Sequence, residues 1–264
     1  MIFGIDHILI AVEDLAKAME LYRRLGFQVL VGGEHPTVGT HNALVPLADG
    51  SYLELIGVKK PELAQQFPFW QQVLEALAKP NRLAGYALES GDVNGDVQAI
   101  RDRGLTIAKA PPGGRARPDG QQVSWRTAHP EDPRLPFLIQ DTTPRSLRVP
   151  PSPDGLNGST QVGWVEIGAA DLQPAITAYT QLFGERPVDG RFALQRGTIR
   201  LSQSFSGDGV QMVALLVQDV AALAAAWQAD ELRFYDESIR GMGRVLVPQD
   251  TGGARLSFCQ FDRN

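Results

Sequence analysis

The chain has 264 residues, a net charge of −5 at pH 7, a single cysteine and a hydrophobic fraction of 43%. These values are typical of one large or two small globular domains, and they exclude a basic nucleic-acid surface and an intrachain disulfide framework. The first residues lack a basic segment and the longest apolar runs are too short for a bilayer. We therefore expect a cytoplasmic protein with no signal peptide and no membrane anchor.

The first predicted elements are a strand and a helix. Ile8, Ile10 and Val12 alternate with other residues at the strand period of two. Apolar residues from Leu15 to Leu25 then recur at helical spacing. Asp14 stands between the two patterns, where a helix N-cap belongs.

Further elements follow in the first half of the chain. Residues 51–56 predict an apolar strand, and residues 61–79 predict an extra helix that ends at Pro80 and crosses to the next structural unit. Residues 121–126 alternate like a strand. Residues 142–159 are rich in Pro, Ser and Gly and predict a domain linker.

An internal repeat organises the chain. A shift of about 157 places Asp14 on Asp171 and Tyr22 on Tyr179, and a second shift places Asp92 on Asp219. Each repeat reads as a strand, a helix and further strands, so we predict four βαβββ modules. Modules 1 and 2 form a first domain, 1–141, and modules 3 and 4 form a second domain, 160–264.

Five short motifs occur in an order and spacing that resemble a known family: Ile5-Asp6-His7-Ile8, Gly32-Gly33-Glu34-His35-Pro36, Gly39-Thr40-His41-Asn42, Tyr52-Leu53-Glu54-Leu55-Ile56 and Leu135-Pro136-Phe137-Leu138-Ile139-Gln140. They resemble the glyoxalase-like domain of the vicinal oxygen chelate superfamily. The resemblance implies an α+β fold in which two modules pair into a cupped, eight-stranded mixed sheet. The four modules then give two cupped sheets with helices on the outside. Metal ligands, where present, come from the first and last strand of each module.

The resemblance makes His7 and Glu54 the leading site residues. Both are polar residues in apolar strands, where a side chain needs a partner or a wet cavity. We predict that both face the first cup and bind a divalent ion such as Zn, Fe, Mn or Ni. His41 is the third candidate ligand, and either Glu54 or His41 is the candidate catalytic group; His35 is an alternative.

Other positions depart from a metal site. The alignment places Gly85 opposite His7, and the last strand of module 2 offers Gln140 and no carboxylate. Trp164 stands at the His7 position of the second domain, which we therefore interpret as structural, or as a lid and dimer surface.

The loop 111–120 carries Arg115 and Arg117. They are candidates for a carboxylate or phosphate clamp, although a solvated loop with incidental charge is the preferred interpretation. We interpret His129 as a turn residue.

Three functional hypotheses remain open. The first is a metal-assisted lyase, isomerase or ring-cleaving dioxygenase acting on a small oxygenated metabolite. The second is a non-catalytic binding protein of the bleomycin-resistance type, and the third is a structural or regulatory module. All three hypotheses predict a small-molecule site or its remnant and no binding to nucleic acid or membranes. All three are compatible with a homodimer.

Overall fold

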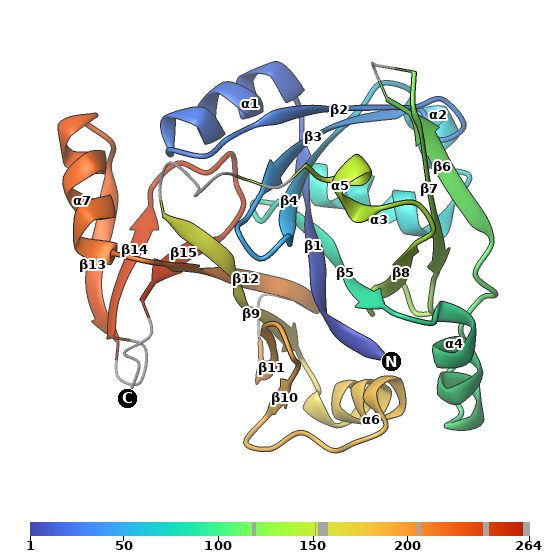
Figure 1. Cartoon of the computed structure of the whole chain (residues 1–264). Helices are drawn as coiled ribbons and strands as arrows, with labels where there is room; N and C mark the ends of the chain where they lie inside the picture. The colour runs from blue at the N-terminus through green and yellow to red at the C-terminus, as the bar shows by residue number, and fades with distance from the viewer. Residues whose placement is uncertain (118–119, 151, 153–157, 205–206, 240–242, 261–264) are drawn as a thin grey trace.

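The molecule contains two mixed β-sheets, one from each half of the chain, as Figure 1 shows in blue to green and in yellow to red. The structure, a computed structural model, describes residues 1–117, 120–150, 152, 158–204, 207–239 and 243–260. The first sheet comprises β1 (Ile2–Val12), β2 (Leu30–His35), β3 (Thr40–Pro46), β4 (Tyr52–Val58), β5 (Leu83–Ser90), β6 (Pro112–Ala116), β7 (Gln122–Ala128) and β8 (Phe137–Asp141). Its strand order is β2-β3-β4-β1-β5-β8-β7-β6.

The second sheet has seven strands among the described residues rather than the predicted eight. It comprises β9 (Ser159–Ala169), β10 (Arg191–Ala193), β11 (Thr198–Gln203), β12 (Gly209–Val217), β13 (Phe234–Ile239), β14 (Gly243–Pro248) and β15 (Leu256–Cys259). The order is β10-β11-β9-β12-β15-β14-β13. Module 3 contributes one strand fewer than the other modules, and the predicted α+β fold of paired modules is confirmed.

A twofold relation links the two modules of the first sheet. In the antiparallel pair β1–β5, Ile8 lies opposite Tyr86, His7 opposite Ala87 and Leu9 opposite Gly85. Exchanging the strands therefore maps His7 onto Gly85, as the sequence repeat predicted. This register identifies which residues of the two modules occupy equivalent places.

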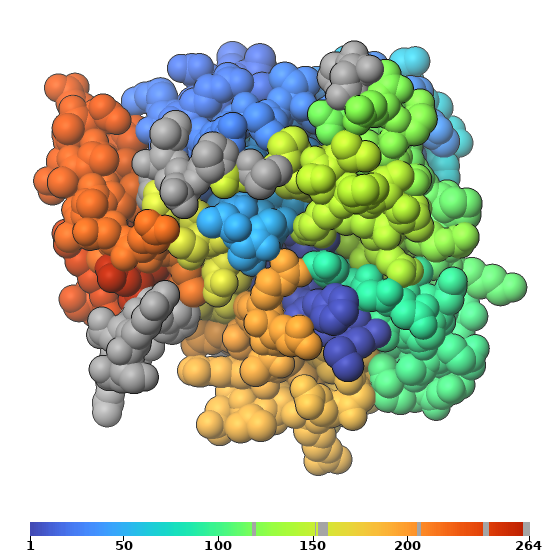
Figure 2. Space-filling model, viewed as in Figure 1, coloured from blue at the N-terminus to red at the C-terminus, as the bar shows by residue number. Residues whose placement is uncertain are grey.

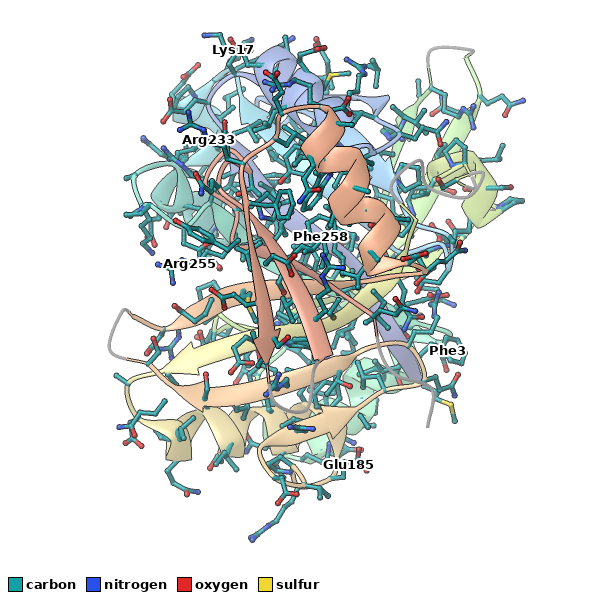
Figure 3. The ribbon with its side chains drawn as sticks, turned by 90° about the vertical axis from the view of Figure 1, so that its left-hand side faces the viewer. Phe3, Lys17, Glu185, Arg233, Arg255 and Phe258 are labelled. Carbon is teal, nitrogen blue, oxygen red and sulfur yellow. The ribbon has the colours of Figure 1, made fainter. Side chains whose placement is uncertain are left out.

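Four helices cover the outer faces of the sheets: α1 (Leu15–Arg24), α4 (Val93–Asp102), α6 (Leu172–Phe183) and α7 (Val220–Ala229). Their buried side chains share one apolar core with residues of both sheets, which therefore pack with their outer faces toward each other. Trp227 of α7 lies 5.0 Å from Phe258 of β15, which Figure 3 shows beside that helix. In Figure 2 atoms of both halves of the chain lie side by side on the visible face.

Hydrogen bonds between the halves reinforce this core. The hydroxyls of Tyr86 and Tyr179 lie 3.0 Å apart, and the Tyr22 hydroxyl donates to the Thr251 carbonyl at 3.3 Å. Trp227 Nε1 donates to the Leu25 carbonyl at 3.2 Å. The predicted equivalence of Tyr22 and Tyr179 therefore coincides with equivalent buried positions on α1 and α6.

The helix predicted over 61–79 is broken into α2 (Pro61–Ala64) and α3 (Pro68–Leu77). Pro68 explains the break, because proline disfavours helical backbone in the residue before it, and Phe67 is extended. Val73 and Ala76 of α3 pack on Leu9 and its neighbours on the inner face of the first sheet. This helix therefore lies inside the cup. Among the described residues, none of the helices has the length and apolar character that a bilayer crossing needs.

Part of the predicted linker is ordered. Residues Arg145–Arg148 form α5, and Arg148 is buried, with 4% of its side chain exposed. The Pro/Ser/Gly pattern of 142–159 did not predict this packing. Residues 151 and 153–157 of that segment, and the last four residues of the second domain, lie outside the described residues.

We predict that Tyr22→Ala and Tyr179→Ala each lower the free energy of unfolding by about 3 to 5 kcal/mol, because both rings are fully enclosed. Urea unfolding measures the change. Lys17→Ala on the exposed face of α1 is the control and should stay within about 0.5 kcal/mol of the parent protein. Costs that small at both tyrosines would contradict the equivalence of the two helices.

Candidate functional site

A cavity of about 620 Å³ opens on the inner face of the first sheet. This volume is in the range of small-molecule sites. His7 and Leu9 of β1 and Tyr52 and Glu54 of β4 point into it, whereas Ile8 and Leu53 point into the core on the other face. Both predicted leading residues therefore lie in the cavity. The other principal lining residues are polar at one end and aromatic at the other: Asn42, His35, Arg115 and Arg148, then Phe69, Trp70, Trp125, His129 and Phe137.

A β-bulge in β1 shapes the polar end. Ile5 pairs with Leu88 and His7 with Ala87, so Asp6 has no partner on β5. In a regular strand Asp6 and His7 would point to opposite faces, but a bulge redirects a side chain. The two side chains meet here, with His7 Nδ1 at 2.6 Å from Asp6 Oδ1. The bulge thus supplies His7 with a carboxylate partner from the adjacent residue.

His7 also faces Glu54 across the cavity floor. His7 Nε2 lies 3.3 Å from Glu54 Oε2, and Asn42 Nδ2 donates to Glu54 Oε1 at 2.5 Å. The Asn42 amide oxygen accepts from the Gly33 backbone at 2.8 Å, which fixes its orientation. The His7 ring stacks on Tyr52 with centroids 4.6 Å apart. Each member of the Asp6–His7–Glu54 chain is therefore held from at least one further side.

Two arginines of α5 neutralise the buried Asp6. Arg148 donates to both carboxylate oxygens of Asp6, at 3.1 and 2.9 Å, and to Tyr52 Oη at 2.7 Å. Arg145 Nη1 forms a further ion pair with Asp6. Burial alone would raise the pKa of Asp6, but Arg148, the bond to His7 and Arg145 hold it well below its ordinary value. Asp6 is therefore ionised near neutral pH.

This ionisation fixes the proton on His7. A carboxylate only accepts hydrogen bonds, so His7 Nδ1 must carry a hydrogen and donate it to Asp6. His7 Nε2 faces Glu54 Oε2 at 3.3 Å, so the imidazole and the carboxylate form an acid–base pair on the cavity floor.

The prediction that His41 lines the cup is wrong. His41 alternates with Ala43 and Val45 as expected, but those residues lie in the core on the outer face. The His41 ring lies over Gly57, where an added Cβ would come within 2.4 Å of its Nε2. The next residue, Asn42, takes the inner position. Alternation groups His41 with Ala43 and Val45, but it cannot show which face of the sheet is the inner one.

His35 does reach the cavity. Its Nδ1 lies 3.0 Å from Thr40 Oγ1, and burial lowers its pKa, against the opposing effect of Glu54. Asn42 and Arg148 also line the cavity and were not among the predicted site residues. A polar Asn one residue from a histidine gives no local signal, and Arg148 lies in a segment with no strand or helix periodicity.

His129 forms part of an aromatic wall rather than a turn. Its ring stacks on Phe137 with centroids 4.7 Å apart and meets Phe69 edge-on at 4.9 Å. Phe137 also contacts the edge of His7 at 5.5 Å. Burial lowers the pKa of His129 to about 4, so the ring is neutral at pH 7. The wall therefore offers a flat apolar surface beside the polar end.

The residues present do not fit a metal held by both modules. In β4, Glu54 lies beside Leu9; in β8, Phe137 lies beside Ala87, the twofold equivalent of Leu9. Phe137 thus occupies the place of Glu54, and Gly85 that of His7. Neither offers a ligand atom, and within the described ranges no group of three or more His, Cys, Asp or Glu could hold a metal ion.

Gln140, which the sequence analysis placed at the ligand position of β8, bonds instead to the backbone of Val93 and Gly91. In the second sheet, Trp164 occupies the His7 position and Arg200 that of Glu54. The guanidinium of Arg200 stacks over Trp164 at 5.3 Å. The second cup therefore carries no counterpart of the His7–Glu54 pair.

Comparison with known proteins agrees with this fold. The model of the glyoxalase-like domain matches residues 5–183, more than half of the chain. The chain belongs to the glyoxalase-like domain family. This family assignment confirms the predicted glyoxalase-like domain. Curated protein sequences give no match.

Solved structures share the architecture of this glyoxalase-like protein at low identity. A hypothetical protein from Staphylococcus aureus is 15% identical with a TM-score of 0.70, and the match covers 97% of this chain and 99% of that one. A mutant 4-hydroxymandelate synthase from Streptomyces coelicolor is 16% identical with a TM-score of 0.65, covering 98% and 93%. A xylose isomerase-like TIM barrel/4-hydroxyphenylpyruvate dioxygenase fusion protein is 12% identical with a TM-score of 0.62, covering 100% and 50%. These similarities establish the fold alone.

The low pKa of His129 predicts acid sensitivity. Unfolded histidine titrates near 6.5 and the folded group near 4, so the unfolded state binds the proton more readily between these values. Stability should therefore be lost as pH falls through this window, by about 3 kcal/mol in total. Urea unfolding of the parent protein and of His129→Phe at several pH values measures the difference. Identical pH dependence of the two proteins would contradict the assignment.

Proposed function

We propose that this glyoxalase-like protein binds a small oxygenated metabolite in the first cup and moves a proton on a carbon next to its carbonyl group. The observation that carries the proposal is the buried Asp6–His7–Glu54 chain at the floor of the cavity. A buried acid–base pair in a ligand-sized cavity is typical of proton-transfer sites. The surrounding aromatic wall would hold the rest of the molecule and exclude water.

In this mechanism Glu54 is the base. Its Oε1 is held by Asn42, and its Oε2 faces both His7 and the cavity. The C–H bond of the substrate breaks, the proton passes to Glu54, and the electron pair becomes an enolate. Returning the proton from Glu54 to the same carbon restores the carbonyl compound, and in D₂O this cycle exchanges the C–H hydrogen for deuterium.

His7 is the group that stabilises the enolate. In the imidazolium form its Nε2–H can donate to the developing oxyanion, while Asp6 accepts from Nδ1 and stabilises the positive ring. Tyr52 stacks on the ring and restricts its rotation. Asp6 and Arg148 act through His7, so we assign them positioning roles. These steps use residues of this chain only.

We assign no step of the proton transfer to the predicted divalent metal, because the described residues of the first cup lack a complete set of metal-binding side chains. We expect purified protein incubated with Fe, Mn, Ni and Zn to retain far less than one ion per chain by elemental analysis. Phe137→Glu, which adds a third donor beside His7, is the control that should gain metal. Stoichiometric metal in the parent protein, lost in His7→Ala, would restore the metal-assisted hypothesis.

Deuterium exchange tests the proton transfer. The protein is incubated in D₂O with a panel of small carbonyl compounds, and NMR follows loss of the C–H signal. We expect Glu54→Gln and His7→Ala to slow exchange by about 10² to 10⁴-fold. His41→Ala, whose ring lies on the outer face, should exchange at the parent rate. Exchange that survives Glu54→Gln would disprove the role of this carboxylate.

The second candidate function is ligand binding without chemistry. It is favoured by Gly85 and Phe137, which remove half of the polar positions that a twofold site would have. Quenching of Trp70 and Trp125 fluorescence reports binding in the cavity directly. Tight binding of a compound with an exchangeable C–H, without any exchange, would favour this alternative.

A further inference from the structure

Within the described part of the chain, one guanidinium at the edge of the cavity forms no ion pair with a carboxylate. Arg115 lies on β6 and lines the same cavity as Glu54 and His7. Its Nη1 donates to the Gly32 carbonyl at 3.3 Å and its Nη2 to the Arg148 carbonyl at 3.4 Å. Across the described ranges it forms no ion pair. Guanidinium has five N–H donors, so two long bonds to carbonyls leave both its charge and most of its donors available.

The neighbouring strand is built to accommodate this side chain. A Cβ at Gly33 of β2 would lie 3.3 Å from Arg115 Cδ, closer than ordinary packing allows. A Cβ at Gly32 would come within 2.0 Å of Asn42 Oδ1. The successive glycines therefore let Arg115 lie against β2 and let Asn42 reach Glu54. The sequence analysis favoured a solvated loop for Arg115, and the structure places it in the cavity wall.

An aromatic surface stands beside the charge. Arg115 pairs with Val123 and Gly113 with Trp125, so Arg115 and Trp125 lie on the same face of the β6–β7 hairpin. Trp125 packs with the cluster that contains Phe137 and Phe69. Neutral His129 completes that cluster, so it adds no second cation. A ligand in this cavity meets the guanidinium of Arg115 at one end and flat rings at the other, whereas the charge of Arg148 is already paired with Asp6.

We propose that Arg115 binds the carboxylate of the natural ligand, which is an organic acid with a flat apolar group. The inference rests on the proposed function in that the same cavity holds the substrate. Guanidinium matches a carboxylate with two parallel hydrogen bonds, and a desolvated cation favours an anion over a neutral group. Bound in this way, the flat group lies on Trp125 and Phe137, and the carbon next to the acid faces Glu54.

Matched acid and amide probes test the proposal. Phenylacetate, indole-3-acetate and 1-naphthylacetate are compared with their amides by tryptophan quenching and calorimetry. We expect the parent protein to bind at least one acid about tenfold or more tightly than its amide, as a charged hydrogen bond would give. Arg115→Met should abolish this preference while leaving amide binding unchanged. Arg117→Met, which removes the same charge outside the cavity lining, should retain the preference.

Three results would overturn the proposal: equal binding of acids and amides, an equal loss of both in Arg115→Met, or no binding of any probe. The same salt dependence of acid binding in Arg115→Met and Arg117→Met would show a general effect of charge and would also overturn the proposal. If amides bind as tightly as acids while deuterium exchange still requires Glu54, only this inference fails. If acids bind through Arg115 and no compound exchanges, only the proton-transfer function fails.

Discussion

The buried carboxylate of Asp6 is the constraint on which the site depends. It lies in a strand bulge with no exposed surface, and an unpaired charge there would cost several kcal/mol. Arg148 and Arg145 supply the compensating charge from α5, about 140 residues along the chain. Removing one partner of such a buried pair costs about 3 to 5 kcal/mol, because the other is left uncompensated. The bulge, the orientation of His7 and the docking of α5 are therefore one cooperative arrangement.

The second half of the chain also supports this arrangement. The Ile5 backbone donates to the Arg196 carbonyl at 3.2 Å, so a loop of the second sheet braces the strand that carries His7. A Cβ at Gly4 would lie 2.6 Å from the oxygen of that carbonyl, which explains the glycine directly before the first motif. The family model extends through α6 and beyond the first sheet. A site confined to the first cup thus depends on packing from both halves, and the positions of His7 and Glu54 are taken in the second sheet by Trp164 and Arg200.

Local sequence patterns predicted the modules because each depends on short-range chemistry: alternation, an Asp cap and a helical stripe. They also placed His7 and Glu54 correctly, since apolar neighbours on both faces leave few other roles for a polar side chain. These patterns failed where the role of a residue depends on tertiary packing. Alternation cannot say which face of β3 is the inner one, so His41 was chosen over Asn42. Nor can composition show that Arg148, in a Pro/Ser/Gly-rich segment, closes an ion pair with Asp6.

The departure from twofold symmetry gives the cavity its direction. Duplication would place the same side chains on both sides of the β1–β5 axis, which suits an ion or a symmetrical ligand held at the centre. Here one side carries His7 and Glu54, and the equivalent positions are Gly85 and Phe137. Phe137 and the rings around it turn that side into an aromatic wall. For the ligand proposed above, this asymmetry defines one binding direction, with its polar end on the side of Glu54 and its flat group on the side of Phe137. Gly85 and Phe137 thus explain both the missing second polar pair and the direction of the cavity.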